Sequence, residues 1–75
     1  MSGWRFVVAE GDVDAFIVGA DAIVIDRLPG AALLEASAAD TERLQAAGGE
    51  RVSVFRNAAV ARTAFEHVAG AAALA

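Results

Sequence analysis

Apolar and polar residues alternate at the start of the chain. In the stretch WRFVVA, residues 4–9, Trp4, Phe6 and Val8 stand at every second position, a period that is typical of a β-strand. The stretch EGDVD that follows predicts a turn, because aspartate and glycine favour turn conformations. The pattern therefore predicts a first strand that ends before Glu10.

The segment from Asp12 to Ala20 fits two structures. Its apolar residues lie on one side of a helix that Asp12 would cap at the N-terminus. Its β-branched and aromatic residues instead favour a strand that turns near Gly19 into the following stretch IVIDRL, residues 23–28. Propensity favours this hairpin, and the short helix remains the alternative.

The one proline of the chain is followed directly by a glycine, and this pair decides how the next segment folds. Proline presets φ at the second position of a type II turn, and Gly30 can take the positive φ that the third position needs. We therefore predict a turn, flanked by Leu28 and Ala31, that joins the strands IVIDRL and AALLEA. A helix that starts at Pro29 is the alternative, because AALLEA is also good helix sequence.

A helix is expected in the middle of the chain. Ser37 and Asp40 have the spacing of a capping box, in which the serine oxygen accepts a hydrogen bond from a backbone N–H of the first turn. The stretch AADTERLQAA, residues 38–47, consists of helix formers, and Gly48 and Gly49 predict its C-terminus. The signals at both ends agree on one helix.

The last third of the chain predicts a strand followed by a helix. The stretch ERVSVFRN alternates, with Val52 and Val54 on one face and Phe55 on the other. Asn57 then predicts the N-cap of a helix, and Gly70 predicts its end. That helix has one apolar stripe, formed by Val60, Ala61, Ala64, Phe65 and Val68.

Together these elements predict one domain that spans residues 1–75. Strands that precede a helix, a strand and a second helix are typical of the α+β class. The expected architecture is a small two-layer sandwich, in which an antiparallel sheet carries two helices on one face. The residues expected to form its core are Trp4, Phe6, Val8, Ile23, Ile25, Leu33, Leu44, Val52, Val54, Phe65 and Val68.

The stretch RLPGAALLEASAADTERLQAAGGERVSVFRN resembles the second half of subtilisin-type propeptides and of the stand-alone protease inhibitors related to them. The resemblance covers Leu28 to Phe55 and implies half of a ferredoxin-like plait: a strand, a Pro-Gly turn, a second strand, a helix and a final strand. It implies an inhibitor or a folding chaperone of a subtilisin-class protease. Such propeptides end in an extended tail that enters the protease cleft, whereas this chain continues into a predicted helix.

Composition limits the chemistry that the chain can perform. It has no cysteine, lysine or tyrosine, which excludes a thiol nucleophile, a Schiff base and a P-loop lysine. The lone His67 shares a helix face with Thr63, but no third group is placed to orient the pair. The acidic Glu10, Asp12 and Asp14 do not follow a calcium-loop pattern and fit a solvated turn. We therefore expect no enzyme activity, no cofactor and no metal site.

Charge and hydropathy limit the partners and the location. The net charge of −4 would repel phosphate backbones and anionic membranes, so we expect neither a nucleic-acid nor a membrane partner. No stretch approaches the ~18 apolar residues of a membrane span, and the first residues lack the pattern of a secretory signal. A cytoplasmic protein is expected if the chain is a whole gene product. Arginine without lysine, beside abundant alanine and glycine, suggests a GC-rich bacterial genome.

The size of the chain favours a function in association with other chains. A domain of 75 residues without disulfides has a core that rarely supplies more than about 3–5 kcal/mol. The apolar share of 57% exceeds the usual ~45–50%, and open sheet edges would leave part of it in water. We therefore expect a non-catalytic protein-interaction or oligomerisation module that binds a protein partner or itself, as a homodimer or larger assembly. Trp4 or Phe55 is expected between the chains.

Overall fold

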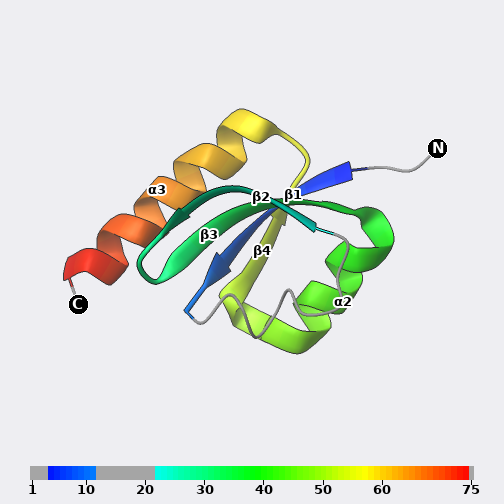
Figure 1. Ribbon diagram of the computed structural model, residues 1–75, viewed down its shortest axis with the longest axis horizontal. Coiled ribbons are helices and arrows are strands. Elements are labelled where there is room, and N and C mark those ends of the chain that lie inside the picture. Colours follow the sequence, from blue (N-terminus) through cyan, green and yellow to red (C-terminus); the bar gives the residue numbers. More distant parts are fainter. Residues whose placement is uncertain (1–3, 12–21, 75) are drawn as a thin grey trace.

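The computed structural model describes residues 4–11 and 22–74 (Figure 1). These residues form four strands, two α-helices and one short 3-10 helix. In chain order they are β1 (Trp4–Glu10), β2 (Ala22–Leu28), β3 (Ala31–Ser37), α2 (Ala38–Gly48), η1 (Gly49–Arg51), β4 (Val52–Phe55) and α3 (Ala58–Leu74). The segment from Asp12 to Ala20, which fits a helix or a strand in sequence, lies outside the described residues.

The four strands form one antiparallel sheet in the order β2-β3-β1-β4. β1 lies inside the sheet and pairs along its whole length with β3, from Trp4 opposite Ser37 to Glu10 opposite Ala31. On its other side β1 pairs with the shorter β4. The predicted α+β class and the antiparallel sheet are therefore confirmed.

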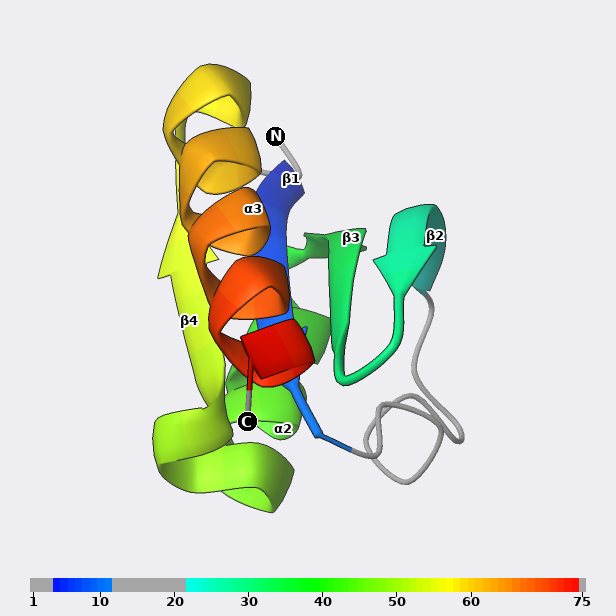
Figure 2. The same cartoon turned by 90° about the vertical axis from the view of Figure 1, so that its left-hand side faces the viewer.

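The sheet carries one helix on each face, and the strands run between α3 and α2 (Figures 1 and 2). Val7 and Val8 are neighbours in β1 and are both buried, although their side chains point to opposite faces. Val7 packs in a cluster with Leu44 of α2, and Val8 packs in a second cluster with Phe65 of α3. We call the two sides the α2 face and the α3 face. The prediction that both helices lie on one face is therefore wrong: β1 and β3 are apolar on both faces, so each face needs its own cover.

The Pro29–Gly30 turn joins β2 to β3. Gly30 has a φ of 84°, and Leu28 pairs with Ala31 across the turn. The Gly30 carbonyl also accepts a hydrogen bond from the backbone N–H of Gly11, with an N–O distance of 2.8 Å, which ties the turn to the end of β1. The predicted turn is confirmed, and the alternative helix from Pro29 is wrong.

Capping side chains determine where both α-helices begin. The Ser37 hydroxyl accepts a hydrogen bond from the backbone N–H of Asp40 at 3.2 Å and donates one to the Asp40 carboxylate at 3.0 Å. The Asn57 side-chain oxygen accepts hydrogen bonds from the backbone N–H groups of Ala59 and Val60. Both predicted helix starts are confirmed.

The two helices differ in how well their ends follow the sequence. α2 ends as predicted, with Gly49 as its C-cap at a φ of 58°. α3 continues past Gly70 to Leu74, because the alanines around Gly70 favour the helix and offset the ~1 kcal/mol that glycine costs there. Val60, expected in the apolar stripe of α3, is exposed.

The core differs from the expected one mainly at one edge of the sheet. Trp4, Ile23 and Ile25 are exposed, so their predicted burial is wrong. β2 is an edge strand that packs chiefly against β3, and neither α2 nor α3 packs over it as they pack over the other strands. Of the remaining expected core residues, the buried ones are Val8, Leu33, Leu44, Val52 and Phe65, and the partly buried ones are Phe6, Val54 and Val68.

The positive φ at Gly30 generates a stability prediction. Gly30→Ala should lower the free energy of unfolding by about 1 kcal/mol, because a β-carbon disfavours this conformation. Gly70→Ala is the matched control: Gly70 lies in α3 with open space around it, so alanine should raise the free energy of unfolding. Urea unfolding followed by circular dichroism measures both variants. Unchanged or raised stability of Gly30→Ala would contradict the need for positive φ at this turn.

Candidate interaction surface

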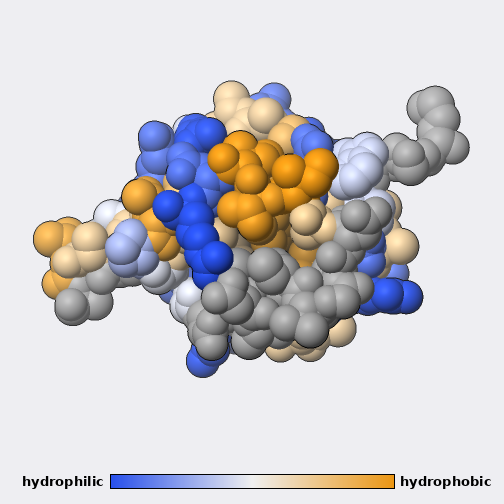
Figure 3. Space-filling model, viewed as in Figure 1, coloured by the Kyte–Doolittle hydropathy of each residue, from blue (hydrophilic) through white to orange (hydrophobic). Residues whose placement is uncertain are grey.

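Apolar side chains gather on the edge strand β2. Ile23, Val24 and Ile25 expose 55%, 42% and 41% of their surface. Figure 3 shows a hydrophobic area over β2, with hydrophilic residues beside it. Monomeric proteins rarely expose large contiguous apolar patches, and the patches they do expose often bind another molecule. This strand is therefore the first part of a candidate interaction surface.

A bulge interrupts β2 at Ile25. Val24 pairs with Leu34 and Asp26 pairs with Leu33, so Ile25 is left without a partner in β3. A bulge of this kind bends its strand and disrupts the regular pairing of the backbone. β2 therefore presents apolar side chains in several directions along its edge.

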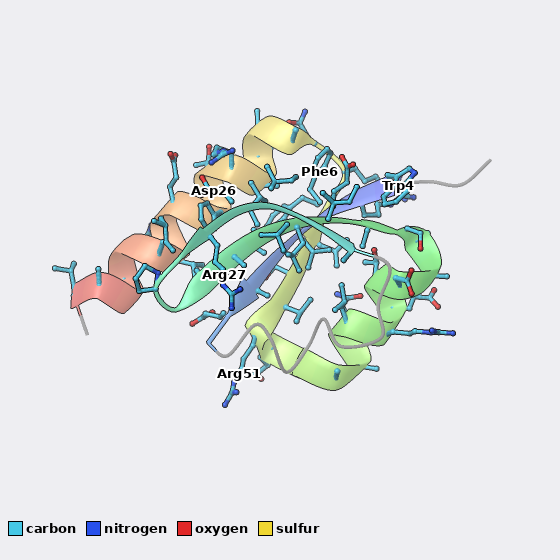
Figure 4. All side chains as sticks on the ribbon, in the orientation of Figure 1. Trp4, Phe6, Asp26, Arg27 and Arg51 are labelled. Atoms are coloured by element: carbon cyan, nitrogen blue, oxygen red, sulfur yellow. The ribbon has the colours of Figure 1, made fainter. Side chains whose placement is uncertain are left out.

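On the α3 face, the apolar edge continues inward to β1. Ile23 lies opposite Glu35 of β3, and Glu35 lies opposite Phe6 of β1, so the three residues form one row across the sheet. Trp4 lies on the same face, two residues before Phe6, and exposes 41% of its surface. Figure 4 shows Trp4 and Phe6 at the same end of β1. We call Ile23, Glu35, Phe6 and Trp4 the β2 corner.

Glu35 places a carboxylate among the apolar side chains of the β2 corner. It is the one charged residue of β3, a strand that is otherwise apolar up to Ser37. Glu35 is partly buried, and it makes no hydrogen bond or ion pair with a described residue. The β2 corner thus contains a negative charge that no described cation neutralises.

An ion pair between α3 and β2 lies next to the β2 corner. Arg62 Nη1 donates a hydrogen bond to Asp26 Oδ2 at 2.6 Å, and the Arg62 guanidinium carbon lies 5.9 Å from the centre of the Phe65 ring. This hydrogen bond, and after it the one from the backbone N–H of Arg27, holds the pKa of Asp26 below its ordinary value. Arg62 is therefore engaged by Asp26 and does not pair with Glu35.

The two residues expected at an interface have different surroundings. Trp4 is exposed and belongs to the β2 corner. Phe55 lies opposite Phe6 on β4, is partly buried, and packs against the cluster under α3. Sequence reasoning missed Ile23 and Glu35, because alternation does not reveal which strand forms the edge. The charged residue inside the apolar stretch AALLEA was the signal that could have indicated Glu35.

The polar residues of α3 fit a solvated helix face. The Thr63 hydroxyl donates a hydrogen bond to the Ala59 carbonyl at 3.0 Å, so the helix backbone engages it. Glu66 and His67 are exposed. Across residues 4–11 and 22–74, no three histidine, aspartate or glutamate side chains gather in a way that could hold a metal ion. Two of the acids expected in a solvated turn, those at positions 12 and 14, lie outside the described residues.

Comparisons with known proteins found no match from which a function could be inferred. The chain matches no protein-family model, no curated protein and no solved structure. None of the described helices is long and apolar enough to cross a membrane. The function is therefore inferred from the β2 corner and the residues around it.

The Arg62–Asp26 pair generates a pH prediction. Because the pKa of Asp26 is lowered in the folded chain, the pair stabilises the fold above the unfolded pKa and loses this contribution as the pH falls through the folded pKa. Arg62→Gln should raise the pKa of Asp26, whereas Arg43→Gln, which removes a partner of Asp40 instead, should leave it unchanged. NMR titration of the Asp26 carboxyl carbon measures the pKa. The same Asp26 pKa in wild type and Arg62→Gln would refute the assigned cause.

Proposed function

We propose that the chain is a non-catalytic protein-interaction module whose partner covers the β2 corner. The exposure of Ile23 on the same corner as the exposed Trp4, on an edge strand that also exposes Val24 and Ile25, carries this proposal. Full burial of one such aliphatic side chain contributes roughly 1.5–3 kcal/mol relative to exposure. In a domain this small, a partner that removes these side chains from water therefore gains a large share of its binding free energy from them.

The interface would extend beyond the corner. A stable interface buries about 800 Å² on each partner, and a polar rim surrounds its apolar centre. At the other end of β2, a hollow of about 350 Å³ separates the β2–β3 turn from α3, and its lining is Leu28, Pro29, Glu66, Ala69, Gly70 and Ala73. The Arg62–Asp26 pair lies on the same side of α3. We therefore place the interface along β2, from the corner toward this hollow.

The partner in this proposal is a different protein. A homodimer or larger assembly, as the sequence predicts, would be a two-fold solution to the same exposed surface. Each copy carries a net charge of −4, however, and like charges oppose association at low ionic strength. A bacterial source and a cytoplasmic location remain part of the proposal.

Replacing Ile23 and Ile25 together by serine tests the surface. Both side chains are exposed, so the double variant should fold, and its affinity for the partner should fall at least tenfold. Val60→Ser is the matched control, because Val60 is exposed on α3 and lines a hollow that no residue of β2 lines. A photo-cross-linking residue at position 23 should capture a protein from extracts of the source cells, and the same residue at the exposed Glu42 should not. Binding of the captured protein, after purification, is then measured by calorimetry with each variant.

Sedimentation equilibrium across the micromolar range measures whether the chain associates with a second copy of itself. An assembly of the wild-type chain that the double serine variant dissolves supports the interaction surface, with a second copy in place of a different protein. A monomer that captures no more protein through position 23 than through position 42 argues against the proposal.

A propeptide-like inhibitor or folding chaperone is the second candidate. The antiparallel order β2-β3-β1-β4, with α2 connecting β3 to β4, favours it, because the resemblance over Leu28 to Phe55 implies a ferredoxin-like plait. α3 departs from this family, since it follows β4 where such propeptides continue as an extended tail.

An inhibition assay separates the two candidates. We expect the chain at equimolar concentration to leave the hydrolysis of a chromogenic peptide by a subtilisin-class protease unchanged, because the helix α3 follows β4 where the family's extended tail would enter the cleft. Heat-treated chain is the control for nonspecific effects. Stoichiometric inhibition would favour the inhibitor over the interaction module.

A further inference from the structure

Glu35 is a charged residue that packing among the described residues does not explain. It stands on the inner strand β3, between Ile23 and Phe6 in one row of the sheet, where an apolar residue would avoid partial desolvation of a carboxylate. Positions that break the local pattern of a fold without a compensating partner are commonly functional. The position of Glu35 therefore calls for a ligand with positive charge.

The neighbours of Glu35 suit a cation on an apolar stem. Phe6 lies directly across from it, and Trp4 is its diagonal neighbour on β1, within reach of long side chains. Aromatic faces attract ammonium and guanidinium groups within ~6 Å, tryptophan most strongly, and a carboxylate accepts charge-assisted hydrogen bonds from the same groups. Ile23 adds apolar surface for the aliphatic part of such a side chain.

The described part of this chain does not supply that cation. Arg62 donates to Asp26 at 2.6 Å, and Glu35 forms no ion pair with a described residue. A second copy would bring another net charge of −4 to the surface. Charge complementarity therefore favours a basic residue from a different protein.

We propose that the β2 corner binds an arginine or lysine side chain of a partner protein, which pairs with Glu35 and stacks on Trp4. Apolar residues on either side of this cation contact Ile23 and the rest of the exposed edge of β2. The inference rests on the proposed function and adds to it the chemistry of the partner: a basic residue flanked by apolar ones.

The test uses two synthetic peptides and the fluorescence of Trp4, the only tryptophan of the chain. One peptide carries a single arginine between two leucines, and the other carries citrulline, an uncharged analogue, in place of the arginine. Titration of the folded wild-type chain should change the Trp4 emission, and the arginine peptide should bind at least tenfold more tightly than the citrulline peptide.

Variants of Glu35 then test whether its carboxylate binds the arginine of the peptide. Glu35→Gln should weaken the arginine peptide at least tenfold and leave the citrulline peptide unchanged. Glu42→Gln makes the same change of charge on the exposed surface of α2 and should leave both affinities unchanged. Glu35→Leu should abolish the preference for arginine while it raises the urea midpoint of unfolding, because leucine fits the apolar row.

Each other outcome overturns the inference in a distinguishable way. Equal binding of both peptides to the wild-type chain, or equal losses of affinity in Glu35→Gln and Glu42→Gln, would overturn the proposal that the partner supplies a basic residue. Either result would leave the proposed apolar interaction surface unaffected. Self-assembly that the Ile23 and Ile25 serine variant dissolves, without peptide binding, would make a second copy the partner. A chain that binds neither peptide, captures no protein and stays monomeric would overturn both this inference and the proposed function.

Discussion

The apolar character of β1 on both of its faces determines the architecture of this chain. Val7 and Val8 are adjacent, both are buried, and their side chains point to opposite sides of the sheet. Neither side can remain in water, so each needs a layer of its own. α2 supplies one layer directly after β3, and the chain beyond β4 supplies the other as α3. The opposite placement of the helices follows from this one strand.

The cover that α3 provides is narrower than the sheet. An α-helix is about 10–12 Å across, whereas four strands spaced ~4.8 Å apart span roughly 15–19 Å. α3 packs closely through Ala61, Phe65 and Ala69, and its Arg62 reaches Asp26 of β2. The first half of β2 lies beyond that contact. The exposed corner is therefore a geometric consequence of one helix lying over four strands.

Signals from neighbouring residues predicted the local structure correctly, whereas contacts between residues far apart in the sequence were not predicted. The proline-glycine turn and the caps Ser37 and Asn57 depend on residues within four positions, so the sequence contains all the information they need. Alternation indicates which residues share a face, but it does not indicate whether a helix lies over them. Trp4 and Phe55 share a face, yet α3 covers only Phe55. Glu35 became a candidate only when the strand register placed it in an apolar row.

The bulge in β2 allows the strand to expose apolar side chains to a partner without favouring the addition of further strands. An apolar edge strand normally invites further strands to add to it, and repeated addition of this kind builds amyloid-like fibres. In β2, the register shift between Val24 and Asp26 breaks the row of backbone groups that an incoming strand would have to match. The chain can thus keep Ile23 and Ile25 in water as side chains to be recognised, while its backbone remains a poor template for fibre growth.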